Sequence, residues 1–216
     1  KSSRWAAILE KYLDNTNEDL VIAALESLTD LRSKKSGTKI TRCLDDPRWR
    51  VQVAALKAIT KREVRKADKK IIKLLSSNDE FVRINAIGAI AGLKITNARA
   101  VLKKVFIEHD DLKGQVIAAY ASMRLPIPKS FIDQLKGKDA NTLFPVLQAV
   151  DDMEALGFDI AIMLADNADP DVSSQATNLL AGMSKAPNRR FIAFQKILAG
   201  KNKNKVLALL KNFNIH

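Results

Sequence analysis

The sequence has little of what β-rich or disulfide-rich folds require. Its 216 residues include only 8 Gly and 6 Pro, aromatic residues make up 6%, and Cys43 is the single cysteine. Few turn residues and few alternating β-branched runs argue against a sandwich or a barrel. One cysteine excludes an internal disulfide and mildly favours a reducing compartment. No apolar run approaches the roughly 20 residues of a membrane span, and the first residues lack the apolar core of a signal peptide.

What the chain has instead is apolar and charged residues in helical proportions. Hydrophobic residues make up 47% of the sequence, which is ample for a core, so we expect an ordered, all-α protein. The chain does not begin with Met. We therefore expect a fragment or processed part of a longer chain, located in the cytoplasm or forming a cytosol-facing domain.

The stretch from Asn78 to Leu93 contains the pattern that the rest of the chain repeats. Four apolar residues follow one another at steps of four, three and one: Val82, Ala86, Ala89 and Ile90. This spacing places them on one stripe of an α-helix, where we expect them to be buried. Asp79 precedes the helix, where its carboxylate can accept from a free backbone N–H. Gly88 and Gly92 are expected to let another helix approach closely.

The same pattern recurs along the chain at a nearly constant spacing. The other sets are Leu20, Ala24, Ser27 and Leu28; Val51, Ala55, Ala58 and Ile59; Leu112, Val116, Ala119 and Tyr120; Thr142, Val146, Ala149 and Val150; Val172, Ala176, Leu179 and Leu180; and Asn202, Val206, Leu209 and Leu210. First members lie 30 or 31 residues apart, a period that indicates stacked units of a solenoid.

A second apolar segment lies between successive sets, so each unit is predicted to be a helix pair. These segments are 5–13, 38–44, 67–75, 98–107, 129–135, 155–164 and 188–198. Prolines agree with this division, because Pro47 and Pro170 precede second helices and Pro128 and Pro187 precede first helices. No interior linker is evident, and we expect residues 1–216 to form a single repeat domain.

The motif itself resembles a known repeat family. Asp-x-x-Val-Arg-x-x-Ala-x-x-Ala-Ile at Asp79–Ile90, with the Asp-Pro openings at Asp46-Pro47 and Asp169-Pro170, is similar to HEAT repeats, in particular to the short variety also found in phycobilin lyases. The resemblance implies a right-handed α-α superhelix of about seven two-helix HEAT-like repeats. It says little about activity, because such repeats serve as scaffolds for many functions.

The net charge of +12 is unevenly distributed. Residues 32–104 carry 20 basic and 6 acidic side chains, whereas residues 105–184 carry 5 and 12. The charge changes sign again in residues 185–216, which carry 8 basic side chains and no acidic ones. A duplex phosphate backbone would favour a more uniformly positive track than this.

In HEAT-type solenoids the second helices usually line the concave face, so the side chains opposite the buried stripe are candidates for a binding groove. The candidates are Trp49, Arg50, Lys57, Lys61, Phe81, Asn85, Gln115, Gln148, Gln175 and Asn178. Many are amides, which can hydrogen-bond an extended chain. We expect a protein or peptide partner there.

Two features of this region have alternative interpretations. Trp49 and Phe81 start adjacent second helices among arginines and are a plausible anchor for a peptide or a nucleobase, or else Trp49 packs beneath its loop. A dense basic patch lies between second and first helices: Arg62, Arg65, Lys66, Lys69, Lys70 and Lys73. It is either a solvated face or a contact for an acidic partner, nucleic acid or an anionic membrane surface.

Catalytic and metal-binding constellations are scarce. His109 with Asp110 and Asp111 could ligate a metal, but the aspartates are also typical helix-start residues, and we predict no metal, no cofactor and no catalytic residue. Cys43 lies on an apolar stripe without a nearby histidine, which favours a buried structural thiol over a nucleophile.

These observations favour a non-enzymatic protein-interaction scaffold. The alternatives are a nucleic-acid-binding protein like the HEAT-like DNA glycosylases, using the basic second and third repeats, and an enzyme like the phycobilin lyases. Apolar residues also collect at the C-terminal repeat, where we expect a homotypic contact or a further segment: Val206, Leu207, Leu209, Leu210 and Phe213.

Overall fold

The computed structural model describes residues 2–31, 36–151 and 157–183. These ranges contain α-helices and short 3-10 turns but no strand, as the all-α prediction requires. The chain divides into two compact units, residues 1–105 and 106–216. The single domain expected from the sequence stays a prediction, and the two units are described separately below.

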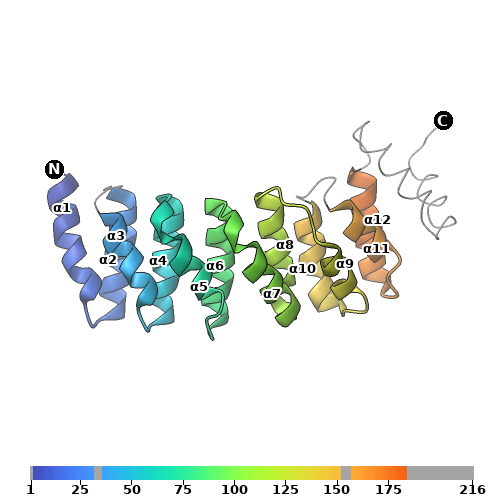
Figure 1. The fold of residues 1–216 in the computed structure, drawn as a ribbon, viewed down its shortest axis with the longest axis horizontal. Coiled ribbons are helices and arrows are strands. Elements are labelled where there is room, and N and C mark those ends of the chain that lie inside the picture. The colour runs from blue at the N-terminus through green and yellow to red at the C-terminus, as the bar shows by residue number, and fades with distance from the viewer. Residues whose placement is uncertain (1, 32–35, 152–156, 184–216) are drawn as a thin grey trace. The chain divides into compact units, whose positions relative to one another are not determined.

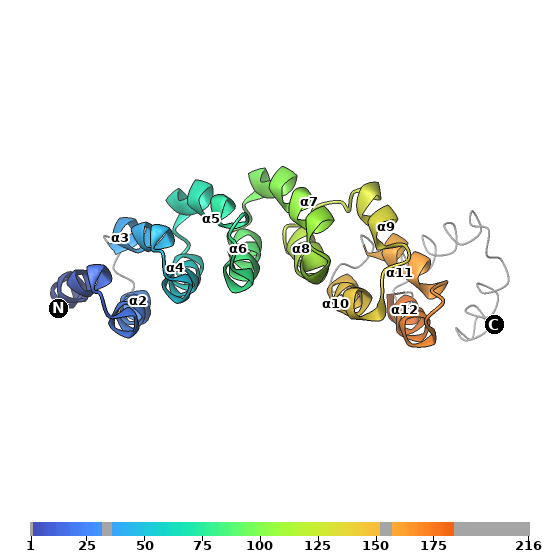
Figure 2. The same cartoon turned by 90° about the horizontal axis from the view of Figure 1, so that it is seen from below.

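The first unit consists of helix pairs in which a broken first helix is followed by a longer second helix. The pairs are α1 (Ser2–Leu9) and η1 (Glu10–Asp14) with α2 (Glu18–Leu31); α3 (Gly37–Arg42) and η3 (Cys43–Asp45) with α4 (Trp49–Lys61); and η4 (Arg65–Ala67) and α5 (Asp68–Leu74) with α6 (Glu80–Leu93). The second helices α2, α4 and α6 pack side by side and form one layer, with α3 and α5 in the other (Figure 1, Figure 2). After η5 (Thr96–Ala98), helix α7 (Arg99–Glu108) contains the boundary between the units.

The second unit continues the same alternation. Its elements are η6 (Asp110–Leu112), α8 (Lys113–Ser122), α9 (Lys129–Leu135), α10 (Ala140–Asp151), α11 (Phe158–Ala165) and α12 (Pro170–Met183). Helix α10 packs between α8 and α12. The described part of the chain is thus a stack of helix pairs within each unit, which confirms the predicted all-α repeat architecture. The seventh predicted repeat, with its apolar C-terminal flank, lies outside the described residues.

The predicted apolar stripes form the core of both units. Val51, Val82, Leu112 and Val172 are fully buried, and the remaining members of their sets are buried or nearly so. In the first set Ala24 and Leu28 are buried as predicted, but the other two members are not. Leu20 is 45% exposed and Ser27 is exposed, whereas Val21, Leu25, Leu28 and Thr29 are buried. The apolar pattern misplaced the stripe because a polar residue, Thr29, occupies a buried position. Its hydroxyl donates to the Leu25 carbonyl at 2.7 Å.

The turns before the second helices share one hydrogen bond that fixes the helix start. A polar side chain accepts the backbone N–H two residues further on in four pairs: Asn15 and Asn17, Asp46 and Arg48, Ser77 and Asp79, and Asn167 and Asp169. Asp79 caps α6 as predicted, accepting from the Val82 amide at 3.0 Å. Asp169 accepts from Asp171 and Val172 in the same way at the start of α12.

The second helices also end alike. Glu63, Lys94 and Arg124 adopt a left-handed conformation with φ of 54–55° just after α4, α6 and α8. The next residue returns its N–H to a carbonyl five residues back, as Ile95 does to Ile90 at 2.9 Å. This is the Schellman arrangement, formed here without glycine.

No helix in the described residues has the length and apolarity that crossing a membrane requires.

Two glycines decide how closely second helices approach. A Cβ at Gly92 would lie 2.8 Å from the Thr60 side chain on α4, so Gly92 permits the close packing that the sequence predicts. A Cβ at Gly114 would lie 2.6–2.8 Å from Pro145, including its backbone, on α10. Gly88 differs, because it is exposed and nothing lies within 4 Å of its Cβ position. The expectation that Gly88 serves close helix packing is therefore wrong.

Candidate binding groove

A pocket of about 490 Å³ lies between α2 and α4 in the first unit. Its walls are Ile22, Glu26, Thr29 and Asp30 from α2 and Trp49, Arg50, Val53, Ala54, Lys57, Ala58 and Lys61 from α4. Four of the candidate groove residues, Trp49, Arg50, Lys57 and Lys61, thus line one pocket. Their spacing on one α-helical face places them there, since α4 buries Val51, Ala55 and Ile59 on the opposite side.

The two helices carry opposite charge across this pocket. At one end Arg50 donates to Glu18 at 2.6 Å and lies 3.2 Å from Asp19. At the other end Lys61 pairs with Asp30 at 3.0 Å. These pairs are exposed, so each contributes little to stability. They do fix the two ends of the pocket, between which its apolar floor remains open.

An aromatic pair lies at the start of the same helices. The Trp49 and Phe81 rings stack with centroids 5.3 Å apart and an interplanar angle of 24°. Trp49 is 43% exposed and Phe81 59% exposed, so the pair presents ring surface to solvent. The predicted proximity of these residues is confirmed. Because Trp49 also lines the pocket between α2 and α4, the stack is continuous with that pocket.

A second hollow of about 440 Å³ lies on the other side of α4, against α6. It is lined by Leu56, Lys57, Thr60, Lys61, Ile84, Asn85, Gly88 and Ala89. The Asn85 side-chain amide donates to the Phe81 carbonyl at 2.8 Å, which holds it against its own helix. Lys57 and Lys61 border both hollows and form the ridge between them.

The remaining groove candidates belong to the second unit. Gln115 lies on α8, Gln148 on α10, and Gln175 and Asn178 on α12. Gln148 and Asn178 are exposed, whereas Gln115 and Gln175 are half-buried. The Gln115 Oε1 atom is buried without a hydrogen-bond partner among the described residues. Their role in binding stays a prediction.

The predicted basic patch divides into two groups. Arg62 donates to the Leu28 carbonyl at 2.9 Å, Arg65 to the Leu93 carbonyl at 2.6 Å, and Lys70 pairs with Asp45. These three side chains join the ends of neighbouring helices. Lys66, Lys69 and Lys73 are exposed. Only the second group resembles a solvated face, and a contact with a polyanion there stays a prediction.

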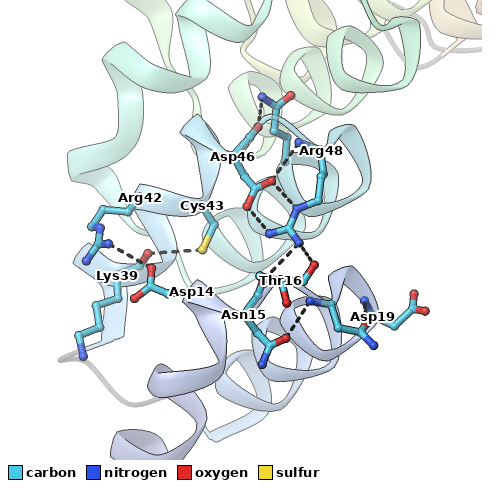
Figure 3. A network of polar contacts seen from close by, with 11 residues as sticks. Asp14, Asn15, Thr16, Asp19, Lys39, Arg42, Cys43, Asp46 and Arg48 are labelled. Carbon is cyan, nitrogen blue, oxygen red and sulfur yellow. Dashed lines mark hydrogen bonds and ion pairs between the residues drawn. The ribbon is translucent and has the colours of Figure 1, made fainter.

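Figure 3 shows a polar network between the first two repeats that the sequence did not reveal. The Arg48 guanidinium binds both Asp46 carboxylate oxygens, at 2.8 and 2.7 Å. It also donates to the Asn15 and Thr16 carbonyls at 3.2 and 2.9 Å. The hydrogen bonds that the Arg48 guanidinium donates to Asp46 hold the pKa of this carboxyl below its ordinary value. Arg48 thereby links the turn before α2 to the turn before α4.

Cys43 lies on the edge of this network and is buried, as predicted for a structural thiol. Its Sγ lies 3.6 Å from the Lys39 carbonyl. Burial, with the nearby carboxylates of Asp46 and Asp14, raises the pKa of the thiol to about 11. The thiolate that a nucleophile requires is therefore disfavoured.

A fully buried lysine organises the second unit. The Lys113 ammonium donates to the Phe106 carbonyl, lies 3.1 Å from Asp110, and stands 4.4 Å from the centroid of the Phe106 ring. Asp110 also pairs with Lys138 at 2.6 Å, and Phe106 stacks on Phe131 at 3.8 Å. Sequence spacing gave no signal for this site. A buried cation persists here because a carbonyl, a carboxylate and a ring face surround it.

The residues His109, Asp110 and Asp111 lie at a helix start. His109 precedes η6 and Asp110 is engaged by the two lysines. In the part of the chain that the structure describes, no group of three or more His, Cys, Asp or Glu side chains could hold a metal ion.

Stacked helix pairs, repeated turn hydrogen bonds and repeated helix ends define the class of α-helical repeat proteins. Residues 38–121 match the family model of HEAT repeats. The resemblance to HEAT repeats inferred from the sequence is therefore confirmed for this segment, which includes α4 and α6 but not α2.

One solved structure agrees with this fold. One chain of the complex of CpcE and CpcF of phycocyanin lyase from Nostoc sp. PCC7120 is similar, with a TM-score of 0.59 and 16% identity over 96% of this chain and 94% of that chain. An engineered protein (TM-score 0.48, 18% identity, 96% and 94% covered) and a designed armadillo repeat protein (TM-score 0.44, 18% identity, 95% and 98% covered) are also similar. No curated protein matches the sequence.

Proposed function

We propose that this protein is a non-enzymatic scaffold that binds a peptide segment of a protein partner across α2, α4 and α6. The observation that supports this most is the pocket between α2 and α4 with the exposed Trp49–Phe81 stack at its rim. Apolar floor, partly exposed aromatic rings and charged rims are the features of protein recognition sites. The phycocyanin lyase structure of similar fold is itself a complex of two chains, which is consistent with a protein partner.

The experiment is selection of a phage-displayed library of random linear peptides on the full chain. Selection is run in parallel on Trp49→Ala and on a matched control, Trp5→Ala. Trp5 is 60% exposed on α1 and does not line the pocket, so both variants lose one exposed indole. We expect peptides enriched on the unaltered protein and on Trp5→Ala but not on Trp49→Ala.

Circular dichroism of both variants checks that they keep their helices. Enrichment that is equal on all three proteins would place binding elsewhere and would contradict the proposal, as would the absence of any enriched peptide.

The alternative of nucleic-acid binding is tested by a DNA mobility shift at two salt concentrations, since contacts to phosphates weaken steeply with salt. A shift lost in a Lys66→Ala, Lys69→Ala, Lys73→Ala variant would favour that alternative.

A further inference from the structure

The two hollows beside α4 have a common boundary that restricts what can bind across it. Lys57 and Lys61 line both hollows, so a segment that crosses α4 must pass over these side chains. Each hollow has apolar walls, with Ile22 and Val53 in the first and Leu56 and Ile84 in the second. The bare surface of Gly88 widens the second hollow, because no atom lies within 4 Å of its Cβ position. The two hollows therefore offer apolar walls on either side of the lysine ridge, each large enough for a side chain.

The separation of the hollows selects a backbone conformation. Packed helices lie about 8–10 Å apart, so grooves on either side of α4 are separated by about the same distance. Side chains on the same side of a β-strand repeat every ~6.7 Å, which is too short. A polyproline II helix has three residues per turn and a rise of about 3.1 Å, so its faces repeat every ~9.3 Å. Apolar residues three positions apart in that conformation match the two hollows.

The charges along the crossing direction add a second restriction. Lys61 is already paired with Asp30, and Arg50 with Glu18 and Asp19. Within the described ranges of the chain, Lys57 and Glu26 are exposed and have no ion pair or hydrogen bond. Lys57 can therefore meet a carboxylate of the bound segment over α4. Glu26 can meet a basic side chain over α2.

We propose that the ligand is a segment in the polyproline II conformation, with apolar side chains three residues apart, a carboxylate between them and a basic residue beyond the apolar side chain nearer α2. This inference rests on the proposed function and specifies the partner's chemistry. The basic residue contacts Glu26, the first apolar side chain enters the hollow between α2 and α4, and the carboxylate contacts Lys57. The second apolar side chain enters the hollow between α4 and α6.

The test uses the peptides enriched on the full chain and a charge exchange at Lys57. We expect the enriched sequences to contain apolar residues three apart with Asp or Glu between them. A synthetic peptide of that consensus should bind Lys57→Glu at least about threefold more weakly, as expected for loss of an exposed ion pair. Replacing its carboxylate by Lys should restore affinity for Lys57→Glu while weakening binding to the unaltered protein. Lys73→Glu, an equal charge change outside both hollows, is the matched control.

The outcomes separate this inference from the function on which it rests. Trp49-dependent peptides without the three-residue spacing, or without charge exchange at Lys57, would overturn the inference and leave the scaffold proposal standing. Absence of Trp49-dependent peptides would overturn both. If Lys57→Glu and Lys73→Glu weaken peptide binding equally, the charge effect is long-range attraction and not a contact with Lys57. That result would also contradict the inference.

Discussion

The rings of Trp49 and Phe81 stack at 5.3 Å although the residues are a full repeat apart in the sequence. Each is the first or second residue of its helix, α4 or α6, so the repeat brings equivalent helix starts together. An aromatic pair worth about 0.5–1.5 kcal/mol would be more stable if buried, yet both rings remain substantially exposed. Exposure of paired aromatic rings beside a pocket is what the scaffold proposal explains.

Removing the Arg48 guanidinium should loosen the first two repeats. Arg48→Ala breaks two bonds to Asp46 and two to the carbonyls of the preceding turn. We expect a lower melting temperature than for Arg42→Ala, the matched control, because Arg42 makes one exposed contact with Asp14. Arg48→Lys should not restore stability, since an ammonium cannot bind the carboxylate in a bidentate manner. Equal melting temperatures for Arg48→Ala and Arg42→Ala would contradict this role.

The Asp46–Arg48 pair should also make the stability of the fold depend on pH in the acid range. The pKa of Asp46 is lowered in the folded protein, chiefly by the Arg48 hydrogen bonds. Its contribution is therefore present above the unfolded pKa, near 3.8, and is lost as the pH falls through the lower folded value. We expect the melting-temperature difference between the unaltered protein and Arg48→Ala to shrink as the pH is lowered from about 5 to about 2. A constant difference would show that Arg48 acts independently of this carboxylate.

Lys113 should tolerate an apolar replacement better than the loss of its partner. Lys113→Met removes the charge, keeps much of the volume and leaves Asp110 paired with Lys138, so it should cost only about 1 kcal/mol, chiefly for the Phe106 carbonyl that loses its donor. Asp110→Ala leaves a buried ammonium without its carboxylate and should cost on the order of 2 kcal/mol, discounted because Asp110 is half exposed. Urea unfolding measures both, with Asp133→Ala as the exposed control. The opposite order of the two costs would contradict the assigned role of the ion pair.

Gly88 and Gly114 should respond oppositely to alanine. Gly88→Ala adds a methyl group to open space within α6 and should stabilise by about 0.8–1 kcal/mol. Gly114→Ala places a methyl group against the Pro145 backbone and should destabilise by about 1–3 kcal/mol. Shifts of equal sign in urea unfolding would be inconsistent with this packing.

The Cys43 thiol should be nearly inert in the folded protein. With its pKa raised from 9.0 to about 11, the thiolate fraction near pH 8 is about 100-fold lower than for an ordinary thiol. Alkylation by iodoacetamide, followed by intact mass, should be slow in buffer and fast in urea. Because Cys43 is the only cysteine, the signal has one source. Comparable rates in both conditions would mean that the thiol is not buried.

The repeat could be predicted from the sequence because apolar residues recur at equivalent positions of successive repeats, although the particular side chains differ. Val51, Val82 and Leu112 stand in equivalent positions and all are buried. Three features could not be predicted, because in each a polar or charged residue, or one without glycine's backbone freedom, occupies a position where residue type alone gives the opposite expectation. Buried Thr29 is satisfied by an intrahelical hydrogen bond, and buried Lys113 by groups from two other elements. Lys94 takes a left-handed conformation that usually signals glycine.

The groove was predictable only in part, for a related reason. Helical spacing identified Arg50, Lys57 and Lys61 as one exposed face, and Trp49 was recognised by its place at the helix start. All four line one pocket. The acidic wall facing them and the ridge shared by two hollows arise from packing between α2, α4 and α6. Spacing within a single helix contains no such information.

The most direct measurement of the central proposal is the fluorescence of Trp49 alone. In a Trp5→Phe background Trp49 is the sole tryptophan, since the chain has only two. Adding a selected peptide should move its emission to shorter wavelength and saturate at one peptide per chain, because the bound segment covers an indole that is now 43% exposed. Unchanged Trp49 emission, with the same labelled peptide shown by anisotropy to be bound, would contradict the account.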